Sequence, residues 1–262
     1  MAKATQEERQ ARIVELIIDH GSLRVDDLAD LFGVSVMTLY RDLAALEAHQ
    51  VIARHRGTVS LLVSSISEAP FAFRLYQETE AKEAVAREAA RLVSRYSSIF
   101  VDDSSTAYLA LDHIGVPESK AFITNASHAA IKIGAGEHQS LTMLGGRFDR
   151  ALDAYFGPTT NRQVGELAFE TALIGAASVK DGSIYHPFSE AALFKREVIA
   201  RTEVPILAIT ADKLSRVALH RLADLSDFSY LIIDDTVTDQ DLNYLHTLTN
   251  VIVANKEGKD NV

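Results

Sequence analysis

The stretch from Val25 to Gly57 limits the fold of this chain more than any other part of it. Its pattern predicts two short helices with a sharp break at Gly33-Val34-Ser35. Ser35 suits the N-cap of the second helix, because its hydroxyl can accept a hydrogen bond from a free amide of the first turn. The apolar residues that then recur at helical spacing form a face that can pack on the first helix: Leu39, Leu43 and Leu46.

The opposite face of the second helix carries several side chains that can hydrogen-bond, and a helix of this shape fits the major groove of DNA. The basic loop Arg54-His55-Arg56-Gly57 follows a strand-sized apolar piece and would form a wing that touches phosphates. We therefore predict a winged helix-turn-helix. The residues expected to contact DNA are Ser35, Val36, Met37, Thr38, Tyr40, Arg41, Arg54, His55 and Arg56.

Two alternatives remain open for this region. The helix pair could be a hairpin that binds a protein instead of DNA. Arg41 could contact a phosphate or a guanine edge, or it could pair with Asp42 or Glu47 as a solvated surface residue.

The net charge of -10 means that DNA affinity must depend on where the cations lie and not on their sum. Residues 1–60 hold seven basic and nine acidic side chains. Arg41, Arg54 and Arg56 could share one face of the domain. Because this leaves few phosphate contacts per subunit, we expect a homodimer or homotetramer on a double-stranded DNA operator.

The remaining N-terminal sequence predicts a helix over Thr5–His20 and two strands, Val51-Ile52 and Thr58–Val63, on either side of the basic loop. The polar, proline-ended stretch Ser64–Pro70 marks a domain boundary. We expect a DNA-binding domain at 1–63, a linker at 64–77 and a second domain at 78–262, which a long helical pattern over Glu78–Tyr96 begins.

From Ser98 onward, short apolar runs rich in β-formers alternate with helical patterns. This alternation indicates an α/β architecture with a largely parallel sheet. The expected strands lie at 99–101, 121–123, 141–144, 171–174, 206–209, 230–233 and 251–253.

Polar residues follow four of these strands directly, and ligands of open α/β sheets bind outside the carboxyl ends of the strands. The four clusters therefore predict one pocket. The expected effector-binding residues are Asp102, Ser104, Ser105, Thr106, Thr124, Asn125, Gly145, Gly146, Arg147 and Lys213. The alternative is a set of capped strand-to-helix turns with Lys213 as a solvated lysine; Lys195 is a weaker candidate than these residues.

Several classes of protein are not expected from this sequence. It has no apolar run of about 18 residues and no signal-peptide pattern, so we expect a cytoplasmic protein with no membrane partner. Zero cysteines exclude disulfides and thiolate metal sites. The nine histidines lack metal-ligand spacing, and we expect no metal and no cofactor.

These residues resemble the DeoR-type bacterial transcription regulators. The N-terminal resemblance rests on Gly21, Val25, Leu28-Ala29, Val34-Ser35, Thr38, Arg41-Asp42-Leu43, Leu46-Glu47, Ile52 and Arg54–Gly57; the C-terminal one rests on Asp102–Thr106, Thr124-Asn125, Gly145-Gly146, Gly157, Asp181-Gly182, Lys195 and Asp212-Lys213. The resemblance implies a sensor domain that is similar in fold to sugar-phosphate isomerases and binds a phosphorylated sugar or a related metabolite.

Three positions depart from the pattern of that family. Tyr40 replaces the first of two consecutive arginines, Arg56 adds a charge to the wing, and Ser104 stands where the post-strand loop has glycine. The Cβ of Ser104 therefore lies where the backbone would approach a phosphate closely.

The leading hypothesis is a transcription regulator, more specifically a repressor of a sugar or polyol catabolic operon, controlled by a phosphorylated sugar or polyol. The rival hypothesis is a sugar-phosphate isomerase-like enzyme with an accessory DNA-binding module. Asp102, Asp103 and Lys213 would then be the acid/base candidates. No paired-carboxylate or nucleophile signature supports catalysis, so we expect no enzyme activity.

Overall fold

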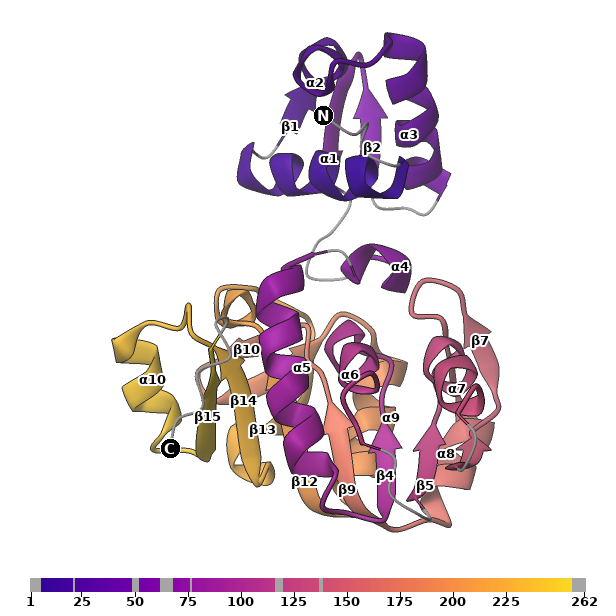
Figure 1. The fold of residues 1–262 in the computed structure, drawn as a ribbon, viewed down its shortest axis with the longest axis vertical. Helices are drawn as coiled ribbons and strands as arrows, with labels where there is room; N and C mark the ends of the chain where they lie inside the picture. The colour runs from indigo at the N-terminus through magenta and orange to yellow at the C-terminus, as the bar shows by residue number, and fades with distance from the viewer. Residues whose placement is uncertain are drawn as a thin grey trace.

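The structure is a computed structural model that describes residues 6–20, 22–48, 52–61, 68–75, 77–115, 120–136 and 139–255 (Figure 1). Val51 and residues 62–63, which belong to the expected wing strands, lie outside these ranges, as do residues 64–67 of the expected linker. None of the described helices is long and apolar enough to cross a membrane.

The N-terminal part is a winged helix-turn-helix, as predicted. Its elements are α1 (Gln6–His20), β1 (Ser22–Arg24), α2 (Val25–Phe32), α3 (Val36–Ala48), β2 (Ile52–His55) and β3 (Thr58–Leu61). The three strands form an antiparallel sheet in the order β1-β3-β2. Gly33 ends α2 in the left-handed conformation, with φ 59°, and its amide bonds to the carbonyls of the last helical turn.

The apolar stripe of α3 forms the centre of this domain. Leu39 and Leu43 are fully buried, together with Ile13 and Ile17 of α1 and Leu28 of α2. Side chains three and four positions apart on α3 therefore face the other two helices, which leaves the opposite face of α3 free.

The C-terminal part contains a seven-stranded parallel sheet in the order β15-β14-β12-β9-β4-β5-β6. Its strands are β4 (Ser98–Val101), β5 (Lys120–Thr124), β6 (Gln139–Met143), β9 (Phe169–Ile174), β12 (Thr202–Ile209), β14 (Tyr230–Asp234) and β15 (Asn250–Ala254). The helices are α4 (Phe71–Arg74), α5 (Thr79–Val93), α6 (Ser105–Ala110), α7 (Ser127–Gly134), α8 (Pro158–Gly165), α9 (Ser189–Ile199) and α10 (Asp239–Leu245), with short 3-10 turns η1 (Ala211–Leu214) and η2 (Leu225–Asp227).

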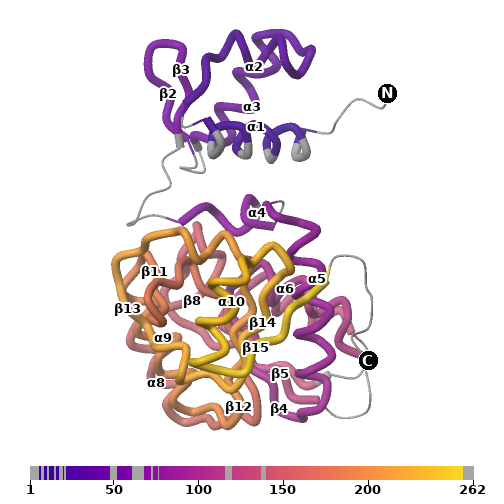
Figure 2. The backbone as a smooth tube through the Cα atoms, turned by 90° about the vertical axis from the view of Figure 1, so that its left-hand side faces the viewer, coloured from indigo at the N-terminus to yellow at the C-terminus, as the bar shows by residue number. Residues whose placement is uncertain are grey.

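Helices cover both faces of this sheet. In Figure 2, α5 and α6 lie on one side of the strands, and α8 and α9 lie on the other. The central strands β4, β9, β12 and β14 are accordingly almost fully buried along their carboxyl halves, which explains their continuous apolar runs. Because the strands are parallel, all the loops that follow them emerge at one edge of the sheet.

Some details of the structure correct the sequence-based expectations. Arg54 and His55 belong to strand β2, so the wing turn contains only Arg56 and Gly57. A two-stranded sheet of β7 (Arg147–Asp149) and β8 (Ala154–Phe156), and a three-stranded one of β10 (Ser178–Lys180), β11 (Ser183–His186) and β13 (His220–Asp224), were not predicted. These strands are short and half-polar, and therefore lack the alternation that identifies a strand.

Candidate functional site

The outer face of α3 is shaped for contact with another molecule. Ser35 precedes the helix, and its Oγ accepts a hydrogen bond of 3.1 Å from the Thr38 amide while lying 2.8 Å from Thr38 Oγ1. Met37 is 77 % exposed, and Val36 and Tyr40 are also exposed. A large apolar side chain left in solvent at the first turn of a capped helix is available for contact with base edges.

A buried ion pair fixes this helix to α1. Arg9 Nε lies 2.6 Å from Asp42 Oδ2, and its terminal nitrogen donates to Oδ1 at 3.1 Å. Asp42 is only 1 % exposed. The carboxylate therefore belongs to the α1–α3 interface and is not a partner of Arg41.

The predicted arginines of the DNA-contact face have different surroundings. Arg54 forms an ion pair with Glu47 and lies over the Tyr40 ring at 5.3 Å, so its charge is partly neutralised within the domain. Arg41 and Arg56 are exposed, and neither has an ion-pair partner among the described residues. His55 is exposed beside them. Of the three arginines predicted for this face, Arg41 and Arg56 are thus available for phosphates.

At the sheet edge, Asp102 is fully buried and organises the loop after β4. Its Oδ1 accepts a hydrogen bond from the Ser104 amide at 2.9 Å, and its Oδ2 accepts from the Gly175 amide at 2.8 Å and from Lys195 Nζ at 2.7 Å. Both oxygens are thus engaged within the protein. Asp102 is placed to hold the loops after β4 and β9 in position.

Lys195 of α9 lies between two carboxylates, since its Nζ is also 3.0 Å from Asp103 Oδ1. Burial would lower the pKa of Lys195, but Asp102 and Asp103 raise it above its usual value. Asp103 is 1 % exposed, and neither of its oxygens accepts a hydrogen bond of normal geometry. Burial would raise the pKa of Asp103, whereas Lys195 and Arg74 lower it.

Ser104, Ser105 and Thr106 are all buried at the start of α6. Ser104 Oγ is the N-cap acceptor for the Ala107 amide at 3.1 Å. Its side chain also fills the space beside Gly175, where a Cβ would lie 2.7 Å from Ser104 Oγ. The serine that departs from the family pattern is therefore accommodated by a glycine on the neighbouring loop.

Thr124 is the last residue of β5, Asn125 follows it, and both are fully buried. Thr124 Oγ1 accepts a hydrogen bond from the Ala126 amide at 3.0 Å, and Asn125 Nδ2 donates to the Tyr155 carbonyl at 3.0 Å. Asn125 Oδ1 has no hydrogen-bond partner among the described residues. This oxygen is an acceptor available at the sheet edge.

The loop after β6 lies at the outer end of the predicted site. Gly145 bonds to α8 through its carbonyl, which accepts from Thr160 Oγ1 at 2.9 Å. A Cβ on Gly146 would lie 2.8 Å from the Phe156 carbonyl, so this position has room only for glycine. Arg147 is exposed and forms an ion pair with Glu190 of α9, away from the buried cluster.

Lys213 lies in η1 after β12, two strands from Asp102. Its Nζ is 3.2 Å from Asp212 Oδ2, which also pairs with Arg216 at 2.5 Å. Burial lowers the pKa of Lys213, and Asp212 opposes this shift. Lys82 of α5 is 3 % exposed, and its ammonium donates to the Arg74 carbonyl.

Residues 68–75, which we call the connecting segment, lie against this edge. The Phe71 amide donates to the Ala151 carbonyl at 2.9 Å, and its ring stacks on His128 with centroids 3.3 Å apart. Burial lowers the pKa of His128 to about 4, so its ring is neutral at pH 7. His128 Nδ1 lies 3.2 Å from Asp153 Oδ2, while Nε2 has no partner among the described residues.

Several buried polar atoms that have no hydrogen-bond partner among the described residues thus gather where the connecting segment meets the sheet edge: Arg74 Nε, the Asp103 oxygens (one of them in ion-pair contact with Lys195), Asn125 Oδ1 and His128 Nε2. Such atoms are rare in folded proteins and each needs an explanation. Donors, acceptors and ammonium groups together suit a ligand with hydroxyls and an anionic group.

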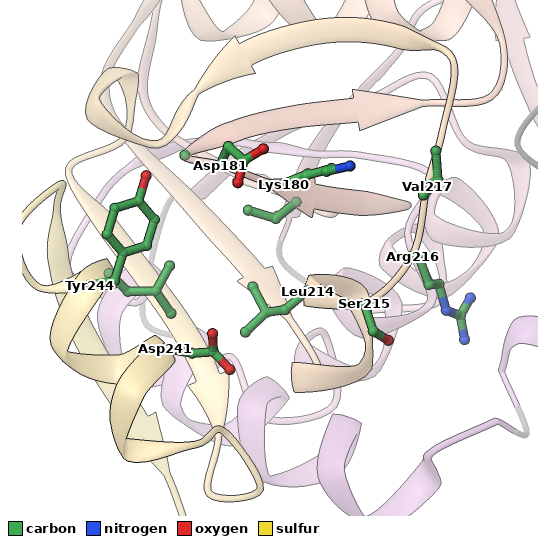
Figure 3. A pocket seen from close by; sticks show the side chains of 11 residues that line it. Lys180, Asp181, Leu214, Ser215, Arg216, Val217, Asp241 and Tyr244 are labelled. Atoms are coloured by element: carbon green, nitrogen blue, oxygen red, sulfur yellow. The ribbon is translucent and has the colours of Figure 1, made fainter.

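The cavities of the described residues are lined by other parts of the sensor domain. Figure 3 shows one of about 310 Å³, lined by Lys180 and Asp181 at the end of β10 and by Asp241 and Tyr244 of α10. A second, of about 450 Å³, is lined by Asp212 together with the loops after β12 and β14. Neither is lined by the buried polar side chains that follow β4 and β5.

The folded chain places further residues at this edge that the sequence analysis did not name: Glu68, Arg74, Lys82, His128 and His186. Lys195, a weaker candidate from the sequence, pairs with Asp102 and Asp103 there. The sequence does indicate that two of these lysines are unusual. Lys82 and Lys195 both occupy the apolar, buried stripe of a helix, where a lysine is rare unless it has a partner. Within the described ranges, no three histidine or acidic side chains come together as a metal ion would need.

Comparisons with known proteins bear on both parts of the chain. Residues 9–65 match the DeoR-like helix-turn-helix domain, and residues 77–235 match the DeoR C terminal sensor domain. The chain is 30% identical over 231 residues to the uncharacterized HTH-type transcriptional regulator YulB of Bacillus subtilis, covering 87% of this chain and 88% of that protein.

Two further relatives extend over nearly the full length. The HTH-type transcriptional repressor GlcR of Bacillus subtilis is 25% identical over 97% of this chain and 99% of its own. The glycerol-3-phosphate regulon repressor of Haemophilus influenzae is 27% identical over 94% of this chain and 96% of its own length. Ribose 5 phosphate isomerase A from Neisseria gonorrhoeae is a weak structural neighbour, with a TM-score of 0.38 and 14% identity. The match covers 51% of this chain and 52% of the isomerase.

The winged helix with its exposed recognition face, the parallel-sheet domain and the two domain matches agree along the chain. This protein belongs to the DeoR family of DNA-binding transcription regulators.

Proposed function

We propose that the protein is a cytoplasmic repressor of a sugar or polyol catabolic operon, and that a phosphorylated sugar or polyol controls its affinity for DNA. The observation that carries this proposal is the group of buried polar atoms that have no hydrogen-bond partner among the described residues, beside the buried Lys82 and Lys195 and the partly buried Lys213 at the carboxyl edge of the sheet. Relatives named as repressors of a glycerol-3-phosphate regulon support the ligand class.

We assign the roles in this site by position. Asn125 and His128 have free acceptor atoms for sugar hydroxyls, while Lys213 provides a cation for the phosphate. Asp102 and Ser104–Thr106 shape the loop, and Gly145 and Gly146 close the far side of the site. Arg147 is the outermost of the proposed residues. The mechanism is linkage, in which a ligand that prefers one conformation of the sensor domain shifts the DNA affinity of the winged helix.

Calorimetry with matched ligands tests the effector class. We expect glycerol 3-phosphate or a hexose phosphate to bind, and the corresponding free polyol or sugar to bind far more weakly. Lys213→Ala should weaken the phosphorylated ligand by roughly ten- to a hundredfold, because a charge-assisted hydrogen bond contributes about 1.5–3 kcal/mol. Lys180→Ala, an exposed lysine on β10, is the matched control. Tight binding of the free sugars alone, unchanged in Lys213→Ala, would rule out the phosphate assignment.

Operator binding tests the DNA-contact face, with an operator selected from genomic fragments. We expect Arg41→Ala and Arg56→Ala to weaken binding and leave the sensor domain folded. Arg56→Ala should act equally on all sequences and reduce the slope of log affinity against log salt by about one, as for a lost phosphate contact. The control is Arg87→Ala on α5, outside the winged helix.

Light scattering of the operator complex measures how many chains bind one operator. We propose that a homodimer or homotetramer binds the operator, since Arg41 and Arg56 of a single chain cannot provide specific affinity alone. If Arg56→Ala binds as tightly as wild type at every salt concentration, the wing is not a phosphate contact. A single chain per operator in light scattering would contradict the proposed assembly.

A further inference from the structure

We propose that the anionic group of the effector binds at the position that the Glu68 carboxylate now occupies, so that Glu68 is an internal competitor of the effector. This inference rests on the proposed function in taking the effector to be an anion. It adds which cations bind that anion, and how its arrival is communicated to the connecting segment.

Glu68 occupies a site that suits an anion. Its Oε2 lies 3.1 Å from His186 Nε2, and its Oε1 lies 3.8 Å from the Arg74 guanidinium. His186 Nδ1 accepts a hydrogen bond from the Phe188 amide at 3.1 Å, so Nε2 carries the proton that faces Glu68. Burial would raise the pKa of Glu68, but Arg74, His186 and Lys195 hold it well below its usual range. The carboxylate is therefore buried and ionised.

Three cationic side chains act on the Glu68 carboxylate, Arg74, Lys195 and Lys213, and Lys82 and Arg216 lie close to Lys213. We call these five basic side chains the cationic cluster. The carboxylates that accompany them are Glu68, Asp102, Asp103 and Asp212. Three of these carboxylates belong to loops of the sheet, and only Glu68 comes from the connecting segment. Without Glu68, the basic side chains of the cationic cluster would be accompanied by only the three loop carboxylates, and another anion would restore the lost negative charge.

Lys82 is the member of the cationic cluster that most needs an anion. It is 3 % exposed, and its ammonium donates to the neutral Arg74 carbonyl, with no carboxylate in ion-pair distance among the described residues. Burial together with Lys213 and Arg74 lowers its pKa well below the usual value. A phosphate beside Lys82 would add the negative charge that this ammonium lacks.

The connecting segment touches both functional parts of the chain. Phe71 stacks on His128 of the sensor domain, whereas Ala69 and Phe73 are buried in the same apolar cluster as the core of the winged helix. Replacement of the Glu68 carboxylate by a ligand anion removes one attachment of this segment to the sheet edge. Effector binding would thereby alter the surface on which the winged helix packs.

The test compares Glu68→Gln with wild type in calorimetric titrations of inorganic phosphate and of the phosphorylated ligands. The amide keeps the shape of the side chain but removes the competing charge. We expect phosphate affinity to rise by at least about tenfold, because like charges placed together cost several kcal/mol. Glu197→Gln, which removes a carboxylate paired with Arg201 on the outer side of α9, should leave the affinity unchanged.

Hydrogen–deuterium exchange on the wild-type chain gives a second measurement that does not depend on the variant folding. Phosphate should accelerate exchange of the Arg74 and Leu75 amides, which bond to the Pro70 and Phe71 carbonyls in the connecting segment. The α5 amides serve as the internal reference.

The outcomes separate this inference from the proposed function. Equal phosphate affinity of Glu68→Gln and wild type, with unchanged exchange in the connecting segment, overturns the competitor role even if sugar phosphates bind. If no sugar phosphate binds but Glu68→Gln gains affinity for inorganic phosphate, the anion site stands and the proposed effector class is wrong.

Discussion

Lys195→Met is expected to lower the free energy of unfolding of the sensor domain by about 3–5 kcal/mol. The substitution leaves Asp102 and Asp103 buried without the ammonium that lies 2.7 and 3.0 Å from their oxygens. Methionine fills a similar volume, so the loss reports the charge and not a cavity. Urea unfolding at pH 7, followed by circular dichroism, measures it.

The stabilisation that Lys195 provides should depend on pH. Because Lys195 lowers the pKa of Asp103, the stabilisation is fully present above about pH 4, where an aspartate of the unfolded chain is ionised. It is lost as the pH falls through the lower pKa that Asp103 has in the folded protein. The difference between Lys195→Met and wild type should therefore narrow in acid. Lys180→Met, on the exposed end of β10, is the control. A difference below 1 kcal/mol at pH 7 would mean that Lys195 does not hold the two carboxylates.

Asp42→Ala is expected to destabilise the winged helix by a similar 3–5 kcal/mol and to abolish operator binding at ordinary concentrations. It leaves the Arg9 guanidinium buried between α1 and α3, where the carboxylate now accepts hydrogen bonds of 2.6 and 3.1 Å. The recognition helix then loses its fixed orientation on α1. Thermal unfolding and operator titration measure the two effects.

A double-mutant cycle distinguishes this buried pair from a DNA contact. Arg9→Met combined with Asp42→Ala should recover part of the lost stability, because the guanidinium that faced the Asp42 carboxylate is removed together with it. Asp30→Ala, an exposed acidic residue on α2, should change neither stability nor binding by more than about 0.5 kcal/mol. If Asp42→Ala is as stable as wild type and still binds the operator, the pair is not structural.

The positions of the connecting segment and of Lys195 suggest that the charged side chains at the sheet edge fall into two groups, one that stabilises the fold and one that acts on ligand affinity. The carboxylates of Asp102 and Asp103 and the ammonium of Lys195 form a buried framework, whereas Glu68, Arg74 and Lys213 are the side chains that we propose to exchange partners when a ligand binds. The framework variants should therefore act on stability, and the others on affinity. Measuring both quantities for each variant separates the two groups.

Much of the fold could be predicted because the buried face of a helix or strand places apolar residues at regular intervals in the sequence. The three-to-four-residue spacing of Leu39, Leu43 and Leu46 predicted the buried face of α3, and every apolar run expected in the sheet is a strand. The order of strands and helices also placed the polar loops at one edge, since parallel strands end on the same side. The short antiparallel strands of the sensor domain were not predicted, because three to five residues are too few to show a clear periodicity.

The partners of the charged side chains were decided by the tertiary structure alone. Arg9 and Asp42 are 33 positions apart and Lys195 and Asp102 are 93 apart, so no local pattern connects them. Periodicity tells which face of an element is buried, but not which group from another element meets it there. The sequence by itself therefore determined the two-domain architecture and the edge of the sheet at which the polar loops gather. Only the folded chain decided that Asp102 holds the loops after β4 and β9 together, that Arg54 is paired with Glu47, and that the connecting segment lies against that edge.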